Sequence, residues 1–546
     1  MQFSNKIFLF AAFWLVFASS VQAQTTAATR VYNIVQQKCV SCHNATSAQG
    51  NLNLSGTQAQ MYAAIFNKVP TNAVAAARGD KLIYPGRPDR SFFFRKLNAG
   101  FEPYAKELAA NEGTNMPAYG APTGSGFTVK EKELLRQWIN FGAPTAGTIV
   151  SDQLITDYYD VNGRPSFPVP PAAPAANEGF QMKIGPFLMA PGAETEFYQK
   201  LELNLPANVE VTRIESIMSN YSHHLITYKY NTAAAAGSAP HGLRTQANYT
   251  NTTLQTAVQE ATDLRLPQGS AFFWNATTVI DMDSHYINYS QTQPYLAEAY
   301  INVYTQPSGT AQQEMKTLLV PNTNISVPAD QNPHTFSQNV TYPLGNVFMW
   351  GLMGHTHKYG TDYKVYKRLA NGTRGAMLYD GQCSEGVPNC FNPYFDYQHI
   401  PLRYFMPFET INMNTGFIHD ATYLNTGTSA VGWGETSNDE MMVVIAMYLT
   451  STTGVIQGTG SITPIHLGDI KIAPNPASDR FVMEFQPDAG ELTVTLHDML
   501  GRELFRTKTT EQKISIPTTE WASGAYLYRV TDKDGRMSSG KVAVVK

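Results

Sequence analysis

Apolar and polar residues alternate along a long central stretch of the chain. Between about residues 178 and 452 this alternation appears at Leu201, Leu203 and Leu205, and again over residues 299–303. Alternation with a period of two places the apolar side chains on one face of a β-strand. About 270 residues of short strands and turns predict two antiparallel β-sandwiches in series, at 178–320 and 321–452.

A helical pattern precedes this region. Residues 24–147 are predicted to form a small all-α domain whose last helix opens with a capping box at Thr128 and Glu131 and stops at Gly142 and Pro144. The apolar face of that helix consists of Leu134, Leu135, Trp138 and Ile139.

Changes in composition divide the rest of the chain. Residues 148–177 contain a Pro/Ala-rich run (RPSFPVPPAAPAAN) and are predicted to be a semi-rigid linker. Residues 453–467 are rich in Gly, Ser and Thr and form a second predicted linker, and 468–546 are again patterned as strands. The predicted fold is therefore multidomain: an all-α domain, two tandem β-sandwiches, and a small Ig-like β-sandwich.

The first 23 residues have the pattern of a secretory signal peptide. Lys6 precedes an apolar run over residues 7–18, and Val21-Gln22-Ala23 provides a small-residue end. The apolar run is shorter than the roughly 20 residues that span a bilayer. An uncleaved membrane anchor is the alternative interpretation.

Charge and cysteine content limit the function classes. The chain has 39 basic and 43 acidic residues and a net charge of −4, so no basic surface suggests nucleic-acid binding. Only four cysteines occur, too few for a disulfide scaffold. Cys383 and Cys390 lie in one loop-like stretch and are predicted to form a local disulfide, with metal binding as the alternative.

The other two cysteines form the strongest single motif. Cys39, Cys42 and His43 make a Cys-x-x-Cys-His sequence, which suits two thioether bonds to a haem and an axial imidazole. Met116, in Asn-Met-Pro, is the candidate sixth ligand, with a packing role as the alternative. A redox CxxC pair or part of a zinc site is the other interpretation of the motif. The segment from CVSCH to QWINFGAP resembles the small cytochrome c domains of secreted bacterial proteins.

The two central sandwiches contain a second set of candidate ligands. Residues two apart in a strand face the same side, so His355 and His357 can share one metal, whereas adjacent histidines can do so only at a bend or through different ring nitrogens. Imidazole suits several transition metals, and an added thioether selects copper. The candidate ligands are His223, His224, His285, His355, His357 and Met441.

These six residues resemble the copper type II, ascorbate-dependent monooxygenases, which include the peptidylglycine α-hydroxylating and dopamine β-monooxygenases. The resemblance covers about residues 180–452 and implies jelly-roll-like sandwiches. It implies that His223, His224 and His285 hold one copper ion. It implies that His355, His357 and Met441, which follows Asp439 and Glu440, hold a second copper ion where O2 and substrate react.

The chain departs from that family at two positions. In the family a cysteine commonly follows the methionine, and another precedes a Tyr-x-Asn-Thr segment; here Met442 and Ala421 stand there. Both partners of that disulfide are absent together, which leaves copper ligation unaffected. The remaining histidines lack ligand-like spacing and are predicted not to bind metal: His241, His334, His399, His419, His466 and His497.

The resemblance implies a C–H-hydroxylating monooxygenase with two copper ions and one haem c. Its partners would be O2, a small-molecule or peptide substrate, and an electron donor, either ascorbate or a redox protein, with the fused haem relaying electrons to copper. A non-catalytic cell-surface protein for electron transfer or copper binding is the alternative.

The C-terminal segment suggests how the protein is exported. Residues 468–546 contain IAPNPASDRF, VTLHDMLGREL and ASGAYLYRVTDKDG. The series resembles the sorting domains of the type IX secretion system of Bacteroidetes, with an ordinary Ig-like accessory domain as the alternative. It implies contact with that machinery and a secreted or cell-surface location.

Overall fold

The computed structural model describes residues 25–99, 101, 108–118, 124, 126–167, 169–219, 221–381, 395, 397, 400–436, 438–464, 470–485, 490–498, 503–532 and 537–546. The signal peptide prediction, the Cys383–Cys390 disulfide, His399 and His466 lie outside these residues. The described chain is mostly β, with several sheets and a few short helices. None of its helices is both long and apolar enough to cross a bilayer.

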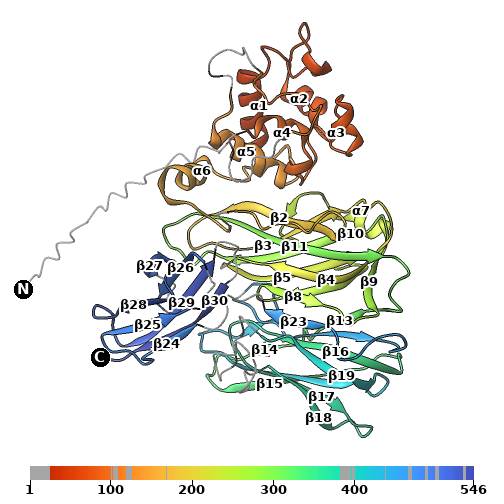
Figure 1. Cartoon of the computed structure of the whole chain (residues 1–546), viewed down its shortest axis with the longest axis vertical. Coiled ribbons are helices and arrows are strands. Elements are labelled where there is room, and N and C mark those ends of the chain that lie inside the picture. Colours follow the sequence, from red (N-terminus) through yellow and green to blue (C-terminus); the bar gives the residue numbers. More distant parts are fainter. Residues whose placement is uncertain are drawn as a thin grey trace, which may run out of the picture.

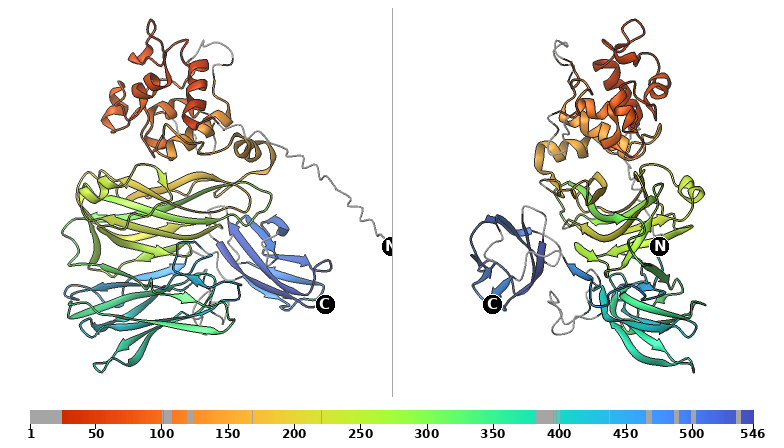
Figure 2. Two further views of the ribbon diagram at one scale, coloured as in Figure 1. Left: turned by 180° about the vertical axis from the view of Figure 1, so that it is seen from behind. Right: turned by 45° about the vertical axis from the view of Figure 1, so that its right-hand side comes forward.

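Four bodies are visible in Figure 1. A helical domain (residues 27–162) sits at one end, above a first sandwich (β1–β12 and β23), which in turn lies above a second sandwich (β13–β22). A C-terminal sandwich (β24–β30) lies to the side of the two central sandwiches, as the additional views confirm (Figure 2).

The helical domain consists of short helices, and the longest of these have 12 residues. The predicted capping box is confirmed: Thr128 Oγ1 accepts the Glu131 N–H at 3.2 Å, and the Glu131 carboxylate accepts the Thr128 N–H at 2.7 Å. The helices are α1 (Ala27–Lys38), η1 (Gln49–Asn51), α2 (Gln58–Ile65), α3 (Ala73–Ala77), η2 (Pro88–Arg90), α4 (Phe92–Leu97), α5 (Val129–Asn140), α6 (Asp152–Thr156) and η3 (Asp157–Asn162).

The predicted Pro/Ala-rich linker is partly structured. Ser151 Oγ accepts the Leu154 N–H at 3.0 Å and caps α6, and η3 continues that helix. Residues Arg164–Pro165 then form β1, which pairs with β11. Composition signalled the proline run but not the Ser cap that precedes it.

The first sandwich packs a larger sheet on a smaller one. The larger sheet runs β1-β11-β4-β8-β23, with β2 paired to β11, β9 to β4, and β12 to β9. Its strands are β1 (Arg164–Pro165), β2 (Gly179–Met189), β4 (Val209–Ile217), β8 (Thr262–Arg265), β9 (Ser270–Trp274), β11 (Tyr295–Pro307), β12 (Gln313–Glu314) and β23 (Ser461–Pro464). The smaller sheet runs β6-β3-β10-β5-β7, with β3 (Glu194–Glu202), β5 (Ser222–Tyr230), β6 (Leu243–Arg244), β7 (Thr252–Val258) and β10 (Val279–Ile287); helix α7 (Ala233–Ser238) follows β5.

The second sandwich has sheets in the orders β13-β22-β16-β19 and β15-β20-β17-β18, with a short β14-β21 pair. Its strands are β13 (Lys316–Pro321), β14 (Ser326–Val327), β15 (Pro333–Val340), β16 (Asn346–His355), β17 (Gly360–Arg368), β18 (Arg374–Asp380), β19 (Arg403–Asn412), β20 (Phe417–Leu424), β21 (Val431–Gly432) and β22 (Val443–Leu449).

The C-terminal sandwich packs the sheets β24-β25-β28 and β27-β26-β29-β30 around its own core. Its strands are β24 (Lys471–Ala473), β25 (Arg480–Glu484), β26 (Leu492–His497), β27 (Glu503–Thr509), β28 (Lys513–Pro517), β29 (Gly524–Asp532) and β30 (Met537–Val544).

The two central sandwiches share buried apolar surface. Trp350, Phe408 and Met447 of the second sandwich belong to the same buried cluster as the core of the first. A further cluster joins Tyr228 and Leu254 of the first sandwich to residues of β16 and β22. Burial of apolar surface on both sides therefore fixes how the sandwiches face each other.

Three glycines make the junction between the helical domain and the first sandwich. Gly86, Gly142 and Gly242 have positive φ values of 77°, 86° and 89°. A Cβ atom on Gly242 would lie 2.3 Å from the backbone nitrogen of Gly142, and one on Gly86 would lie 2.6 Å from the nitrogen of Gly242. The two backbones can approach this closely only without side chains.

Replacement of Gly242 by alanine tests this junction. We expect Gly242→Ala to lower the free energy of unfolding by about 2–4 kcal/mol, because the new Cβ meets backbone atoms and the positive φ is strained. Chemical denaturation of the full chain measures the effect. Gly237→Ala in α7 is the matched control, since no atom lies within 4 Å of its Cβ position. Equal stability of the two variants would contradict the prediction.

Candidate metal centre

Three histidines of the first sandwich converge at a β-bulge. His224 on β5 pairs with His285 on β10, but the next pair along β10 is Tyr286 with Ser222. His223 is therefore the extra residue of the bulge, which lets two adjacent histidines face the same place. Adjacent histidines were expected to reach one metal at a bend in the strand or through different ring nitrogens, and the bulge is such a bend.

The geometry of these three rings suits a small metal ion. One ring nitrogen from each of His223, His224 and His285 lies within 4.8 Å of the others, and all three side chains are buried. The Nδ1 atoms of His223 and His224 are 3.4 Å apart. Tetrahedral ligands at roughly 2.0–2.1 Å from a metal are about 3.4 Å apart. Because these donors are prearranged, the residues fit a bound transition metal.

Carboxylates fix the orientation of two of the rings. His224 Nε2 lies 2.9 Å from Glu196 Oε1, and His285 Nε2 lies 2.9 Å from Glu194 Oε1. A carboxylate accepts, so each Nε2 carries a proton, and in the neutral form of each ring Nδ1 keeps the lone pair. His285 Nδ1 is buried and has no hydrogen-bond partner among the described residues. An orphaned buried nitrogen of this kind suits a metal ligand.

The second candidate set lies at the end of β16. His355 ends the strand, His357 follows in the turn before β17, and their ring centroids are 5.3 Å apart. Glu440 accepts the backbone N–H groups of His357 at 3.0 Å and Tyr359 at 2.7 Å. His357 Nδ1 lies 3.1 Å from the Asp439 carbonyl oxygen, and its buried Nε2 has no partner within the described chain.

Met441 is held close to this turn through its neighbours. Tyr423 donates its hydroxyl hydrogen to the Met441 carbonyl at 2.6 Å, while the Met441 side chain packs in the apolar cluster between the sandwiches. The segment 439–441 thus lies against His357.

The two sets are neighbours across the boundary between the sandwiches. The ring centroids of His224 and His355 are 6.1 Å apart. Burial and the neighbouring imidazoles lower the pKa of His355 well below its usual value, and burial lowers the pKa of His357 to about 4. Burial and His285 likewise lower the pKa of His223. These three rings are therefore neutral at pH 7 and can donate lone pairs.

The pKa of His224 shifts upward instead, because carboxylates lie beside its ring. Burial alone disfavours its charged form, but the hydrogen-bonded Glu196 carboxylate and the Asp283 carboxylate, 3.6 Å from Nε2, outweigh burial and raise the pKa of His224 to about 10. Glu194, Glu196 and Asp283 were not among the residues predicted from the sequence. The Glu-x-Glu spacing on β3, which places both side chains on one face of the strand, was the available signal.

The Cys-x-x-Cys-His motif begins directly after α1. Cys39 and Met116 are both half-buried against the core of the helical domain. The His43 N–H donates to the Cys39 carbonyl at 3.0 Å, and His43 Nδ1 donates to the Gln49 carbonyl at 3.0 Å, which leaves Nε2 as the free acceptor. Burial raises the pKa of the Cys39 thiol to about 12.

Other histidines lie outside the cluster. His419 is buried in the second sandwich, 2.6 Å from the Tyr363 hydroxyl and 2.7 Å from Gln338 Oε1, and His334 contacts Asp330. His497 lies on β26 of the C-terminal sandwich.

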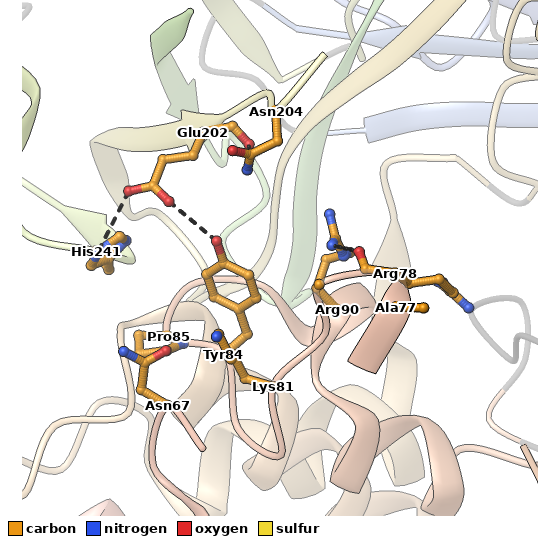
Figure 3. A pocket seen from close by; sticks show the side chains of 11 residues that line it. Asn67, Ala77, Arg78, Lys81, Tyr84, Pro85, Arg90, Glu202, Asn204 and His241 are labelled. Carbon is orange, nitrogen blue, oxygen red and sulfur yellow. Dashed lines mark hydrogen bonds and ion pairs between the residues drawn. The ribbon is translucent and has the colours of Figure 1, made fainter. Parts of the chain in front are cut away.

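His241 lines a cavity of about 470 Å³ between the helical domain and the first sandwich (Figure 3). In that cavity Glu202 accepts the Tyr84 hydroxyl at 3.2 Å and lies 3.8 Å from His241.

Comparison with known proteins identifies the C-terminal sandwich. The family of secretion system C-terminal sorting domains matches residues 471–545. An endo-acting ulvan lyase of Formosa agariphila is 31% identical over 77 residues, which are 14% of this chain and 15% of the lyase. The protein is therefore secreted or displayed at the cell surface through the type IX system.

Solved structures resemble the chain only weakly. PorZ, a surface component of the type IX secretion system of Porphyromonas gingivalis, is 19% identical, covers 18% of this chain and 15% of its own, and has a TM-score of 0.14. A β-glucuronidase from Ruminococcus gnavus is 9% identical over 39% of this chain and 35% of its own, also with a TM-score of 0.14. At these scores the similarities carry no argument about the central sandwiches.

Metal-dependent stabilisation tests the three-histidine site. We expect chelator-treated protein to gain about 2.7 kcal/mol of stability when Zn²⁺, a redox-inert probe, is added at 100 times its dissociation constant. We expect the gain to be lost in His285→Ala when thermal unfolding is measured. His334→Ala, whose ring lies beside Asp330, serves as the control and should keep it. Full stabilisation of His285→Ala would show that these residues hold no metal.

Proposed function

We propose that the protein is a secreted copper-dependent monooxygenase that hydroxylates a C–H bond of an organic substrate with O2. The observation that carries this proposal is the convergence of His223, His224 and His285 within 4.8 Å, next to a His-x-His pair of the neighbouring sandwich. The resemblance to the copper type II monooxygenases, residue by residue at these positions, supports it.

Each set of residues would hold one copper ion. His223, His224 and His285 offer imidazoles alone. The other set, His355, His357 and Met441, adds a thioether, a soft ligand that selects copper and especially Cu(I). Copper bound at both positions would supply the two electrons that, with two protons, reduce one atom of O2 to water while the other atom is inserted into the C–H bond.

The chain's own residues orient the candidate ligands and limit the access of water to them. The Glu440 carboxylate holds the backbone of the His357 turn, and the Asp439 carbonyl orients the His357 ring. Met441 is partly buried and packs against the apolar cluster between the sandwiches, which limits the access of water. The 6.1 Å between the His224 and His355 rings keeps the path between the two sets short.

We further propose that Cys39, Cys42 and His43 hold one haem c, with Met116 as its sixth ligand. A redox-active CxxC pair requires a lowered thiol pKa, whereas the pKa of Cys39 is raised to about 12. The His43 Nδ1 contact with a carbonyl presents Nε2 for axial ligation. A haem with His and Met ligands supplies a one-electron centre of raised potential.

The motif lies away from the junction with the first sandwich. Lys38, beside the motif, contacts Glu131 in the first turn of α5, whereas Asn140 at the other end of α5 contacts the Pro186 carbonyl of the first sandwich. Nine residues of helix correspond to about 14 Å. This separation favours the helical domain as a site where an external donor, ascorbate or a redox protein, delivers electrons.

Substitution of a ligand separates catalysis from electron storage. We expect Met441→Ala and His357→Ala to lower O2 consumption coupled to a hydroxylated product by at least about 100-fold, because several kcal/mol of transition-state stabilisation are lost. Oxygen electrode and mass spectrometry measure this, and the haem absorption spectrum should stay unchanged. His334→Ala is the control.

The alternative, a non-catalytic electron-transfer or copper-binding protein, predicts copper binding without any hydroxylated product from the unmodified chain across a screen of candidate substrates. That result would overturn the monooxygenase proposal.

Measurements at several protein concentrations test whether electrons pass from the haem to copper within one chain. If the haem supplies copper within one chain, the rate of copper reduction after haem reduction is independent of protein concentration. Stopped-flow spectroscopy measures it, with Cys39→Ala/Cys42→Ala as the haem-free control. No transfer from haem to copper at any concentration would eliminate the relay.

A further inference from the structure

Among the described residues, carboxylates contact imidazole rings of one candidate copper site and not of the other. At the three-histidine site, Glu196 and Glu194 accept from ring nitrogens of His224 and His285. At the second site the ring nitrogen of His357 meets a neutral backbone carbonyl, and Glu440 binds backbone N–H groups instead.

We propose that Glu194 and Glu196 are positioning residues that turn Nδ1 of His285 and His224 toward copper and stabilise Cu(II) over Cu(I) at the three-histidine site. This inference rests on the proposed function.

The register of β3 on β10 places Glu194 and Glu196 on the histidine side of the sheet. β3 pairs with β10 so that Glu196 is opposite His285 and Glu194 is opposite Ile287. Residues two apart share a face of the strand, so both carboxylates lie on the histidine side. Each accepts the Nε2 proton, and if the ring were flipped, the carboxylate would lose its donor and Nδ1 its exposure to the metal position. The two hydrogen bonds therefore select Nδ1 as the ligand atom.

The negative charge of Glu196 lies beside the His224 ring. Glu196 is mostly buried, with a side-chain exposure of 15%, and no Lys or Arg of the described chain forms an ion pair with it. Hydrogen bonds to an anion make an imidazole a stronger donor. Cu(II) carries one more positive charge than Cu(I), so nearby negative charge stabilises the oxidised ion, and low dielectric strengthens the effect.

The two candidate copper sites differ in their ligands and in the partners of their rings. The thioether of Met441 favours Cu(I), and the His357 ring has a neutral partner. Ligand type and hydrogen bonding would thus stabilise Cu(II) at the three-histidine site and Cu(I) at the methionine-containing site. An electron is then more stable at the second site, which is where O2 would be reduced.

The experiment compares Glu196→Gln with Glu202→Gln in full-length protein carrying His357→Ala, which leaves the three-histidine site as the copper site studied. Gln keeps an acceptor for His224 but removes the charge. Glu202 lies on the same strand and contacts Tyr84 instead of the histidine cluster. Competition with Cu(II)- and Cu(I)-specific chelators gives both affinities.

We expect Glu196→Gln to weaken Cu(II) binding about 10–100-fold and Cu(I) binding much less, and Glu202→Gln to change neither. Each tenfold loss of Cu(II) affinity that leaves the Cu(I) affinity unchanged raises the one-electron reduction potential of the copper site by about 59 mV. EPR spectra should report altered nitrogen ligation in Glu196→Ala, which also loses the orienting acceptor. Glu194→Gln repeats the test through His285 and decides it if the Glu196 variants do not fold.

The outcomes separate this inference from the proposed function. Copper binding to the parent protein with identical Cu(II)/Cu(I) preference in Glu196→Gln and Glu202→Gln overturns the inference and leaves the monooxygenase proposal standing. Absence of copper binding at the three-histidine site overturns both.

Discussion

The pairing of β10 with β3 on one side and β5 on the other is the interaction on which the candidate metal centre depends. One neighbour places His224 opposite His285, and the other places Glu196 opposite the same residue. His285 and Glu194 are 91 positions apart in the chain, so backbone hydrogen bonds between strands, not local sequence, create the contact. A slip of one residue in either register would send these side chains to the opposite face.

The histidine cluster destabilises the folded protein before any metal ion binds. His223 Nε2, His285 Nδ1 and His357 Nε2 are buried without partners among the described residues, and each such atom costs about 1–3 kcal/mol. An apolar cluster lies at the same boundary, and apolar packing does not explain five histidines there. Unsatisfied groups concentrated at one point are characteristic of functional sites, which retain them for chemistry.

The features that were predictable from sequence are those with local or periodic signals. Period-two alternation indicated the β-rich region, and Thr128 with Glu131 gave the start of α5. The histidines were found by spacing and resemblance. The bulge at His223 was not predictable, because it depends on how β5 meets β10, and the roles of Glu194 and Glu196 depend on the same long-range register. The Gly86–Gly142–Gly242 contact joins two domains and leaves no pattern around any one glycine.

The position of β23 bears on the order in which the chain can fold. Residues Ser461–Pro464 follow the second sandwich in sequence but pair with β8 of the first. During synthesis the second sandwich therefore has all its strands before the first has received its last one. The edge of β8 stays open until the roughly 200 residues between them are in place, and an open strand edge is a surface on which another chain can pair. The strand that closes this edge directly precedes the sorting domain, so the first sandwich is complete only when almost all of the chain before the export signal is available for folding.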